Sequence, residues 1–372
     1  MSFFSVRYDL VQVDKPLLFD LYINSSIVKG KEKFVRIFPA GEVLKKDDLE
    51  EFHKKYLQIY VAEDQRKTYL RSLMQSNTDD VIKTNVLKDA ALDYLHNIFD
   101  KNKEFSTELL SQSIEGCREV VENMVDVLDD HNIDSLRGLI GNLSFHDFYT
   151  YDHSINVSMY CITIYRAVNP GAGRRELIHA GLGGLLHDLG KIKIPTHILN
   201  NPGGLTQEDY QTIKLHPDFG LELLLSGHCE VDPSLDLKII ARVIHEHHEN
   251  FDGTGYPGKL KGKEEIHLLA RVCAIADFFD AVTTKRSYNE VLPVADAMNI
   301  MRKTKGTKLD PDIFDIFDKH VRYVRTDATR DLRLADSFDP TLPYAHLPLE
   351  EVSKFAKEMD FGKIKVVDSK KK

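Results

Sequence analysis

The sequence predicts a mainly α-helical protein that begins with a small α+β module, and two observations support this. Residues 1–75 contain short β-branched and aromatic runs separated by Gly and Pro, which is typical of strands and turns. From about residue 80 to residue 324, apolar residues recur three and four positions apart, the spacing of amphipathic helices. The 372 residues are enough for two or three domains.

The N-terminal module, residues 1–75, is expected to combine strands with two helices. Four β-branched or aromatic runs are expected as strands: Tyr8–Val13, Leu17–Ile23, Phe34–Phe38 and Leu57–Val61. Two segments, Lys46–Tyr56 and Gln65–Met74, have the amphipathic pattern of helices. No group of residues capable of catalysis occurs here, so we expect a regulatory or dimerisation module.

The rest of the chain divides into three parts by pattern. Residues 76–125 are expected to be a helical connector, with helices over Val86–Phe99 and Ser106–Leu128 and joints at residues 76–80 and 100–106. Residues 126–324 are expected to form a helical domain, with a helix over Ile133–Leu143 near its start. Residues 325–372, which contain three prolines and end in three lysines, are expected to be a loosely packed tail.

Composition excludes several classes of protein. Lys and Arg total 49 against 58 Asp and Glu, a net charge of −9, so the chain lacks the basic footprint that a nucleic-acid polymer requires. No apolar run is long enough to span a membrane, and the first residues do not resemble a secretory signal. None of the four cysteines forms a C-x-x-C pair, which is typical of reduced thiols. We therefore expect a cytoplasmic protein without membrane insertion.

Histidine is the residue type that points to chemistry. Ten of the 16 histidines lie between His146 and His248. The strongest local motif, His187-Asp188-Leu189-Gly190-Lys191, closes an apolar segment. Its adjacent imidazole and carboxylate can bind one divalent ion together, and the second carboxylate oxygen is free to bridge to another ion. The similar pair His146-Asp147 is interpreted as incidental.

A second motif runs from His247 to Pro257, with the sequence HHENFDGTGYP. Adjacent histidines on a helix point about 100° apart, so both reach one site only where the helix ends. The glycines and the proline end the helix and allow a tight loop close to a ligand. His153 and His216 are further candidates. Asp277 is another, because a carboxylate inside an apolar helix needs a partner, which is either a metal or an arginine such as Arg271.

The order of these motifs, His…His-Asp-x-x-Lys…His…His-His-Glu-x-x-Asp-Gly-x-Gly-Tyr-Pro…Asp, resembles the HD-GYP domain. This is the bacterial branch of the HD phosphohydrolase superfamily that hydrolyses cyclic di-GMP. The resemblance covers about residues 126–324 and extends to Gly190–Pro195, Ile198–Pro202 and Ala270–Tyr288. It implies an all-α bundle whose metal ligands project from several helices into one cleft. Residues 154–161 alternate like a strand, but the resemblance implies a helix there, and we follow it because a buried helix loses its amphipathic pattern.

The resemblance also implies a set of site residues. It places one metal among His153, His187, Asp188 and Asp277, and a second among Asp188, His216, His247 and His248. Iron and manganese fit such a donor set equally well. Asp188 and Lys191 are implied as the catalytic residues. Lys191, Gly255, Tyr256 and Arg286 are implied at the substrate, with Lys191 placed to stabilise charge on the phosphate.

Two departures from the family pattern affect these expectations. Tyr149 stands where some members place a glutamate that holds a third metal, so two metals are expected. Asn289, three residues after Arg286, stands where the family commonly offers a lysine. This departure bears on which substrate the site would bind and how tightly. The expected product is linear pGpG, with GMP after a second cut. His179 and His245 are expected to be packed or hydrogen-bonded and not metal-bound.

Three readings of the function stay open at this point. The first is a metal-dependent cyclic di-GMP phosphodiesterase. The second is a low-turnover cyclic di-GMP sensor, or a module that docks on a diguanylate cyclase through the Gly-Tyr-Pro loop. The third is a phosphodiesterase for another cyclic dinucleotide. The sequence leaves open whether the chain forms a homodimer.

Overall fold

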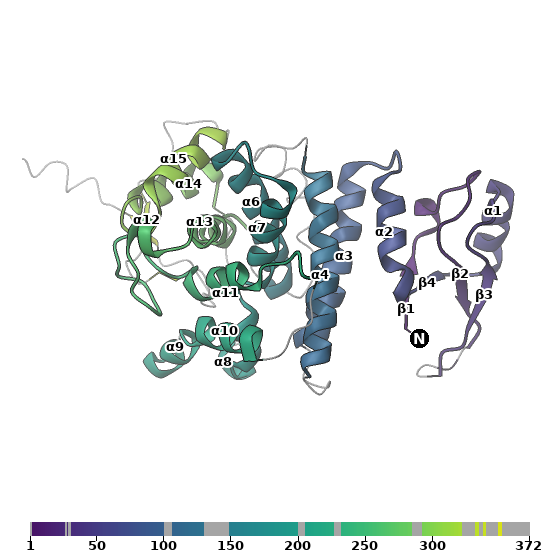
Figure 1. Cartoon of the computed structure of the whole chain (residues 1–372), viewed down its shortest axis with the longest axis horizontal. Helices are drawn as coiled ribbons and strands as arrows, with labels where there is room; N and C mark the ends of the chain where they lie inside the picture. Colours follow the sequence, from purple (N-terminus) through teal and green to yellow (C-terminus); the bar gives the residue numbers. More distant parts are fainter. Residues whose placement is uncertain are drawn as a thin grey trace, which may run out of the picture.

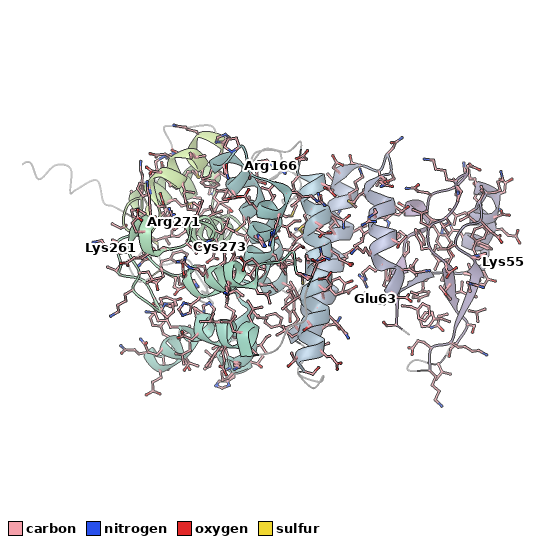
Figure 2. All side chains as sticks on the ribbon, in the orientation of Figure 1. Lys55, Glu63, Arg166, Lys261, Arg271 and Cys273 are labelled. Carbon is pink, nitrogen blue, oxygen red and sulfur yellow. The ribbon has the colours of Figure 1, made fainter. Side chains whose placement is uncertain are left out.

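The computed structural model of the chain describes residues 2–26, 28, 31–99, 106–129, 149–199, 205–226, 232–284, 292–321, 332–334, 338–339 and 349–351. The N-terminal sheet lies at one end, a helical domain lies at the other, and the helices α3 and α4 stand between them (Figure 1). Lys55 marks the outer end of the sheet module, whereas Cys273 lies inside the helical domain (Figure 2). None of the described helices is both long and apolar enough to cross a membrane.

The N-terminal sheet is antiparallel with strand order β1-β4-β2-β3. Its elements are β1 (Phe3–Val6), β2 (Leu21–Asn24), β3 (Phe34–Phe38) and β4 (Ile59–Ala62), with the helices α1 (Lys46–Lys55) and α2 (Arg66–Met74). The prediction of a strand over Tyr8–Val13 is wrong, because Tyr8–Leu10 form a short 3-10 helix. The Tyr8 hydroxyl donates to the carbonyl of Tyr56 at 2.8 Å, so its ring lies against the end of α1 instead of entering the sheet. Strand β1 was not predicted.

The connector consists of α3 (Asp80–Phe99) and α4 (Thr107–Val127), which pack side by side (Figure 1). Helix α3 begins six residues before the predicted start at Val86, because the Asp79 carboxylate accepts from the Val81 amide at 2.8 Å and caps an earlier turn. Helix α4 begins as expected, with the Ser106 hydroxyl accepting from the Leu109 amide. The second joint at 100–105 and the predicted helix Ile133–Leu143 lie outside the described residues.

The helical domain is built around α6, α7 and α13. Its helices are α6 (Tyr149–Val168), α7 (Arg174–Leu186), α8 (Thr196–Leu199), α9 (Gln207–Ile213), α10 (His216–Ser226), α11 (Leu237–Glu246), α12 (Gly262–Glu265), α13 (Leu268–Thr283), α14 (Val294–Lys303) and α15 (Pro311–His320). Residues 154–161 belong to α6, so the helix is confirmed against the alternating pattern. Every one of these residues is buried, because α6 contacts α3, α4, α7, α13 and α15. Burial on all sides removes the polar face that would have revealed a helix.

The hydrophobic core is continuous from Val6 to Phe338. Beyond α15, β5 (Leu332–Leu334) pairs antiparallel with β6 (Leu349–Glu351). Leu334 and Phe338 are buried in the core, and Phe338 lies edge-on to Phe278. The expectation of a loosely packed tail is therefore wrong at these residues, whose apolar side chains cover part of the helical domain.

Candidate metal centre

Seven polar side chains from five segments of the helical domain meet in one buried cluster. The segments are α6, the end of α7, the start of α10, the end of α11 and the middle of α13. Each of the seven residues is at most 8% exposed: His153, His187, Asp188, His216, His247, His248 and Asp277. These are the residues that the sequence resemblance proposed as metal ligands, so the fold brings the whole predicted set together.

Within this cluster, ligand atoms fall into three groups that could each hold an ion. One group is His153, His187 and Asp277, and another is His216, His247 and His248, with the atoms of each group within 4.8 Å of one another. The third group, His187, Asp188 and His247, joins the first two. The geometry is therefore that of two adjacent metal positions with Asp188 between them.

Three of the histidines are oriented by a carbonyl group near the end of the helix that precedes them. In His187, His216 and His247, Nδ1 contacts the carbonyl oxygen three residues earlier, at Gly184, Ile213 and Ile244, over 2.7, 2.8 and 2.9 Å. A carbonyl oxygen only accepts, so Nδ1 must carry the proton. Each Nε2 is then left with a free lone pair, which is the form in which imidazole binds a metal.

The residues fit a metal because several of their atoms make no hydrogen bond. Nε2 of His187 and His248, Oδ1 of Asp188 and both carboxylate oxygens of Asp277 are buried without a hydrogen bond. A buried polar atom in this state costs about 1–3 kcal/mol. His153 Nε2 lies 3.0 Å from Asp277 Oδ1. Bound cations would satisfy these atoms, and mixed nitrogen and carboxylate donors suit iron or manganese.

The protonation states also suit metal binding. Burial lowers the pKa of His216 to about 3 and that of His247 to about 4, and it holds the pKa of His248 well below its usual range. For Asp188, burial works against ionisation, but the neighbouring His187 imidazole and the Lys191 ammonium group hold its pKa well below the usual value. At neutral pH these imidazoles are therefore neutral and this carboxylate is ionised.

Asp277 has no arginine partner on its own helix. Arg271, one of the two arginines that the sequence offered as alternative partners, instead forms an ion pair with Asp310, and the other, Arg286, lies outside the described residues. Burial would raise the pKa of Asp277, but its contact with His153 outweighs burial and lowers the pKa. Asp277 thus directs an ionised carboxylate into the metal cluster.

Asp280 is a residue of the site that the sequence reasoning missed. It is fully buried one turn after Asp277, and its Oδ2 accepts from His153 Nδ1 at 2.7 Å. Its carboxylate also accepts from Asn156 Nδ2 at 3.0 Å and from the Thr284 hydroxyl at 2.7 Å. This arrangement resembles the carboxylate–histidine pairs that orient metal ligands. The sequence did contain a signal for Asp280, which is a second aspartate three residues after Asp277 on the same apolar helix. Residues at this spacing lie on one face of a helix.

Lys191 is buried beside the cluster and is not a surface residue. Its Nζ donates to Asp188 Oδ2 at 2.7 Å, from the 3-10 helix at Leu189–Lys193. This short helix lies directly against α10, because a Cβ at Gly190 would come within 1.8 Å of the His216 carbonyl oxygen. The glycine of the His-Asp motif therefore lets His216 approach Asp188, with His216 Nε2 3.5 Å from Asp188 Oδ1.

The loop after His248 forms one wall of the site. Gly255 is required there, because a Cβ at this position would come within 2.1 Å of the Asn250 amide nitrogen. The Tyr256 ring stacks on His248 with the ring centroids 4.8 Å apart. The Tyr256 hydroxyl donates to Asp339 Oδ2 at 2.5 Å. Asp339 belongs to the segment expected as a tail, and no feature of the sequence indicated this contact.

A cavity of about 140 Å³ lies between this loop and the metal cluster. It is lined by His247, His248, Gly255 and Tyr256 together with Asp277. Phe338 and Asp339 line it as well. Pockets for ligands of drug size usually measure about 300–1,000 Å³, so a substrate as large as a dinucleotide requires this cavity to widen.

Three predicted positions lie wholly or partly outside the structural description. Arg286 and Asn289 fall between the described residues 284 and 292. Tyr149 begins α6, but its side chain is not among those described. Their implied roles stay predictions.

His179 and His245 do not join the cluster. His179 Nε2 accepts from the Asp236 amide at 3.0 Å, and His245 Nε2 lies 3.1 Å from Asp218 Oδ1. The expectation that both are hydrogen-bonded and not metal-bound agrees with these contacts.

Comparison with known proteins identifies the domain that carries this cluster. Residues 148–313 match the family model described as HD domain. A cyclic di-GMP phosphodiesterase from Pseudomonas aeruginosa is 40% identical over 180 residues, which are 48% of this chain and 41% of that protein. A 3′3′-cGAMP-specific phosphodiesterase from Vibrio cholerae is 32% identical over 182 residues, which are 49% of this chain and 37% of that protein. The chain thus spans about two fifths of the length of these relatives.

The solved structure of an HDG"Y"P protein from Bdellovibrio bacteriovorus shares the fold. It superposes with a TM-score of 0.53 at 19% identity and covers 86% of this chain and 99% of its own. The likeness therefore extends beyond the matched domain into the N-terminal half of the chain. Residues 148–313 thus match an HD domain, and a relative named as a cyclic di-GMP phosphodiesterase agrees with the resemblance that the sequence shows.

Proposed function

We propose that the helical domain is a metal-dependent phosphodiesterase that hydrolyses cyclic di-GMP to linear pGpG, with GMP as the product of a second cut. The observation that carries the proposal is the buried cluster of nitrogen and carboxylate atoms without hydrogen-bond partners. When bound, two divalent ions polarise a phosphate and make water nucleophilic near neutral pH. The name of the relative from Pseudomonas aeruginosa supports the choice of substrate.

The proposed ligands divide as the cluster does. His153, His187 and Asp277 hold one ion. His216, His247 and His248 hold the other, and Asp188 serves both. We propose two ions of iron or manganese per chain, since Tyr149 replaces the carboxylate that a third ion would require.

Other side chains act on the substrate. Lys191 keeps Asp188 ionised and presents a buried cation to the phosphate, where it opposes the negative charge that grows during bond cleavage. Gly255 and Tyr256 form the wall against which the substrate lies. Arg286 is proposed to contact phosphate or guanine, because its planar guanidinium can bind either one bidentately.

A second candidate function is hydrolysis of another cyclic dinucleotide, such as 3′3′-cGAMP. It is favoured by the relative from Vibrio cholerae and by Asn289, which stands where the family commonly has a lysine. A low-turnover sensor, or a module that docks on a diguanylate cyclase, is less well supported because the implied two-metal ligand set is complete.

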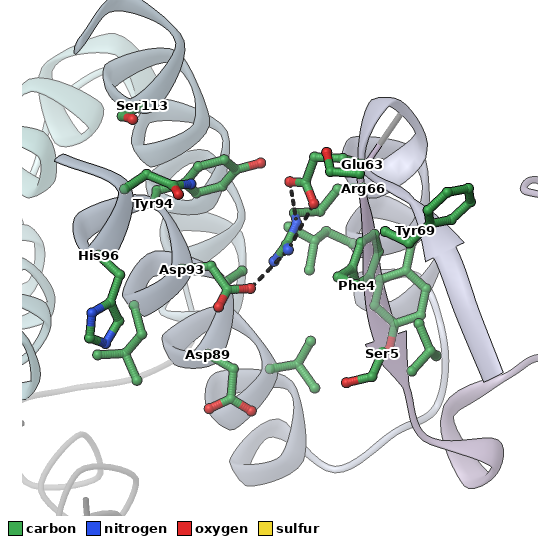
Figure 3. Close-up of a pocket in the computed structure, with 18 of the residues that line it drawn as sticks. Phe4, Ser5, Glu63, Arg66, Tyr69, Asp89, Asp93, Tyr94, His96 and Ser113 are labelled. Carbon is green, nitrogen blue, oxygen red and sulfur yellow. Dashed lines mark hydrogen bonds and ion pairs between the residues drawn. The ribbon is translucent and has the colours of Figure 1, made fainter. Parts of the chain in front are cut away.

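The division of the chain into domains and its cellular location are part of the same proposal. Residues 1–75 are a regulatory or dimerisation module, residues 76–125 are the connector, residues 126–324 are the phosphohydrolase domain and residues 325–372 are a C-terminal segment. The module is held on the connector by ion pairs from Arg66 to Asp93 and from Lys67 to Glu119 (Figure 3 shows the first). The buried free thiols of Cys117, Cys161 and Cys273 support a cytoplasmic location.

Metal analysis and a turnover assay on the same sample test the function. The full chain, purified without oxygen, is expected to contain two metal ions and to convert cyclic di-GMP to pGpG, as read by chromatography. Parallel incubations use 3′3′-cGAMP and cyclic di-AMP. Turnover of 3′3′-cGAMP alone would favour the second candidate, and no turnover by a fully loaded protein would favour the sensor. Occupancy near three ions would show that the inference from Tyr149 is wrong.

A further inference from the structure

Helix α3 lies outside the matched HD domain and yet contributes a buried cation close to the metal cluster. Lys88 of α3 is 5% exposed, and burial lowers its pKa to about 8. A lysine loses considerable hydration and side-chain freedom when it is buried in this way. A methionine would fill the same space at a lower cost, so the charged end of Lys88 calls for an explanation.

The ammonium group of Lys88 begins a series of hydrogen bonds that ends at a proposed metal ligand. Lys88 Nζ donates to Asn156 Oδ1 at 2.9 Å, and Asn156 Nδ2 donates to Asp280 Oδ1 at 3.0 Å. Asp280 Oδ2 accepts from His153 Nδ1 at 2.7 Å. His153 Nε2 then faces Asp277 Oδ1 at 3.0 Å. The series joins three helices, α3, α6 and α13, without an exposed member.

The donor and acceptor roles give Lys88 a specific task. An ammonium group only donates, so it requires the oxygen of the Asn156 amide on its side. The NH₂ group of Asn156 is thereby directed at Asp280. Without Lys88, the Asn156 oxygen would lose its donor, and Asp280 alone would hold the amide in place. The amide would then be fixed less firmly, and with it the Asp280 carboxylate that orients His153.

We infer that Lys88 is a positioning residue of the metal centre, which fixes the imidazole of His153 through Asn156 and Asp280. The inference rests on the proposed function only in treating His153 as a metal ligand. It makes the connector helix α3 a part of the site, although the family match begins at residue 148. A purely structural lysine would affect folding and leave metal affinity unchanged.

Manganese binding separates these two roles without a substrate. Full-length chain is stripped of metal, and the affinity for Mn²⁺ is measured by calorimetry for the wild type and for Lys88→Met. We expect the variant to bind Mn²⁺ about two- to tenfold more weakly, a coupling typical of neighbours in one network. Lys83→Met is the matched control, because Lys83 lies on the same helix and pairs with Asp80. The control should bind as the wild type does.

Two further variants test the middle of the series. Asp280→Asn should weaken Mn²⁺ binding about 10- to 100-fold, as is typical of groups that hold a metal ligand. Asn156→Asp keeps an acceptor for Lys88 but removes the donor to Asp280, so it should weaken binding while Lys88 stays paired. This variant also tests the inference if Lys88→Met does not fold. If Lys88 acts through Asn156, adding Lys88→Met to Asn156→Asp should weaken binding less than the product of the two single effects.

The outcomes distinguish this inference from the proposed function. Wild-type affinity in a folded Lys88→Met variant, or single effects that multiply in the double variant, would overturn the inference whatever the enzyme hydrolyses. A wild-type chain that binds Mn²⁺ but cleaves no cyclic dinucleotide would overturn the proposed function and leave the inference standing. A wild-type chain that binds neither Mn²⁺ nor Fe²⁺ would overturn both.

Discussion

Two cavities among the described residues differ in size and in the hydrogen bonding of their polar groups. The cleft between the N-terminal module and α3 measures about 1,150 Å³, against about 140 Å³ beside the metal cluster. In the larger cleft, Arg66 pairs with Glu63 and Asp93 (Figure 3), and its Nε, which makes no hydrogen bond, lies 2.7 Å from Glu63 Oε1. In the smaller one, His248 Nε2 and both carboxylate oxygens of Asp277 are buried without a hydrogen bond. The proposed chemistry thus lies where buried polar atoms without hydrogen bonds gather, and not where the cavity is larger.

Among the variants considered, removal of Asp188 should have the largest effect on turnover and on the metal content. Asp188→Ala is expected to abolish turnover and to remove most of the bound metal, because one carboxylate serves both ions. Metal per chain is measured by mass spectrometry beside a turnover assay. Asp93→Asn, which changes an aspartate of the larger cleft, is the matched control and should leave both values unchanged. Normal metal content in Asp188→Ala would show that the two-metal assignment is wrong.

Removal of Lys191 should have the next largest effect. Lys191→Ala, assayed at saturating Mn²⁺, is expected to lose about 10²–10³ in kcat with little change in KM, the scale for one preorganised donor. Its contact with Asp188 means that metal affinity must be measured in the same sample. A variant with full metal loading and near-normal kcat would exclude Lys191 from the catalytic residues.

The buried charge of Lys88 predicts a pH-dependent difference in stability. The folded pKa of Lys88, about 8, lies below the ordinary lysine pKa of 10.5, so between these pH values the folded chain has released a proton that the unfolded chain retains. Stability therefore rises with pH in this window, and the cost of burying the charge is fully present below pH 8. Three carboxylates oppose the shift: Asp152 on α6, Asp280 on α13 and Asp89 on α3.

Urea unfolding of metal-free chains at pH 7 to 10 measures this difference. Between pH 8 and pH 10, wild type should gain stability relative to Lys88→Met by up to roughly 3 kcal/mol. Lys83→Met should follow the wild type over the same range. A constant difference between wild type and Lys88→Met across the range would contradict the lowered pKa.

The smallest effect is expected in the larger cleft. Arg66→Met removes the ion pairs to Glu63 and Asp93, whose carboxylates are 33% and 56% exposed and are readily hydrated instead. We expect a loss of about 1 kcal/mol in stability and no change in Mn²⁺ affinity. Thermal melting and calorimetry on one preparation provide both values. A change in Mn²⁺ affinity would show that the module communicates with the metal centre through this contact.

Those parts of the site whose residues lie together in short sequence motifs were predicted from the sequence. His187-Asp188 and the His247–Pro257 loop are local, and their glycines explain the close approaches seen at Gly190 and Gly255. Asp280, Lys88 and Asp339 escaped prediction because each acts through a partner that lies 68 to 127 residues away in the sequence. Tyr8 was misread for a similar reason, since its partner at Tyr56 decides against a strand.

The continuous core has a practical consequence for the choice of fragments to express. A fragment cut at the limits of the family match, residues 148 and 313, would lose α4, against which α7 packs so closely that a Cβ at Gly181 would meet Val121 at 2.7 Å. It would also lose Phe317, which lies edge-on to Phe279 with ring centroids 5.1 Å apart. Both cuts would expose apolar surface to water. The smallest unit that retains these two contacts runs from about Thr107, where α4 begins, to His320, where α15 ends, and so extends beyond the matched domain.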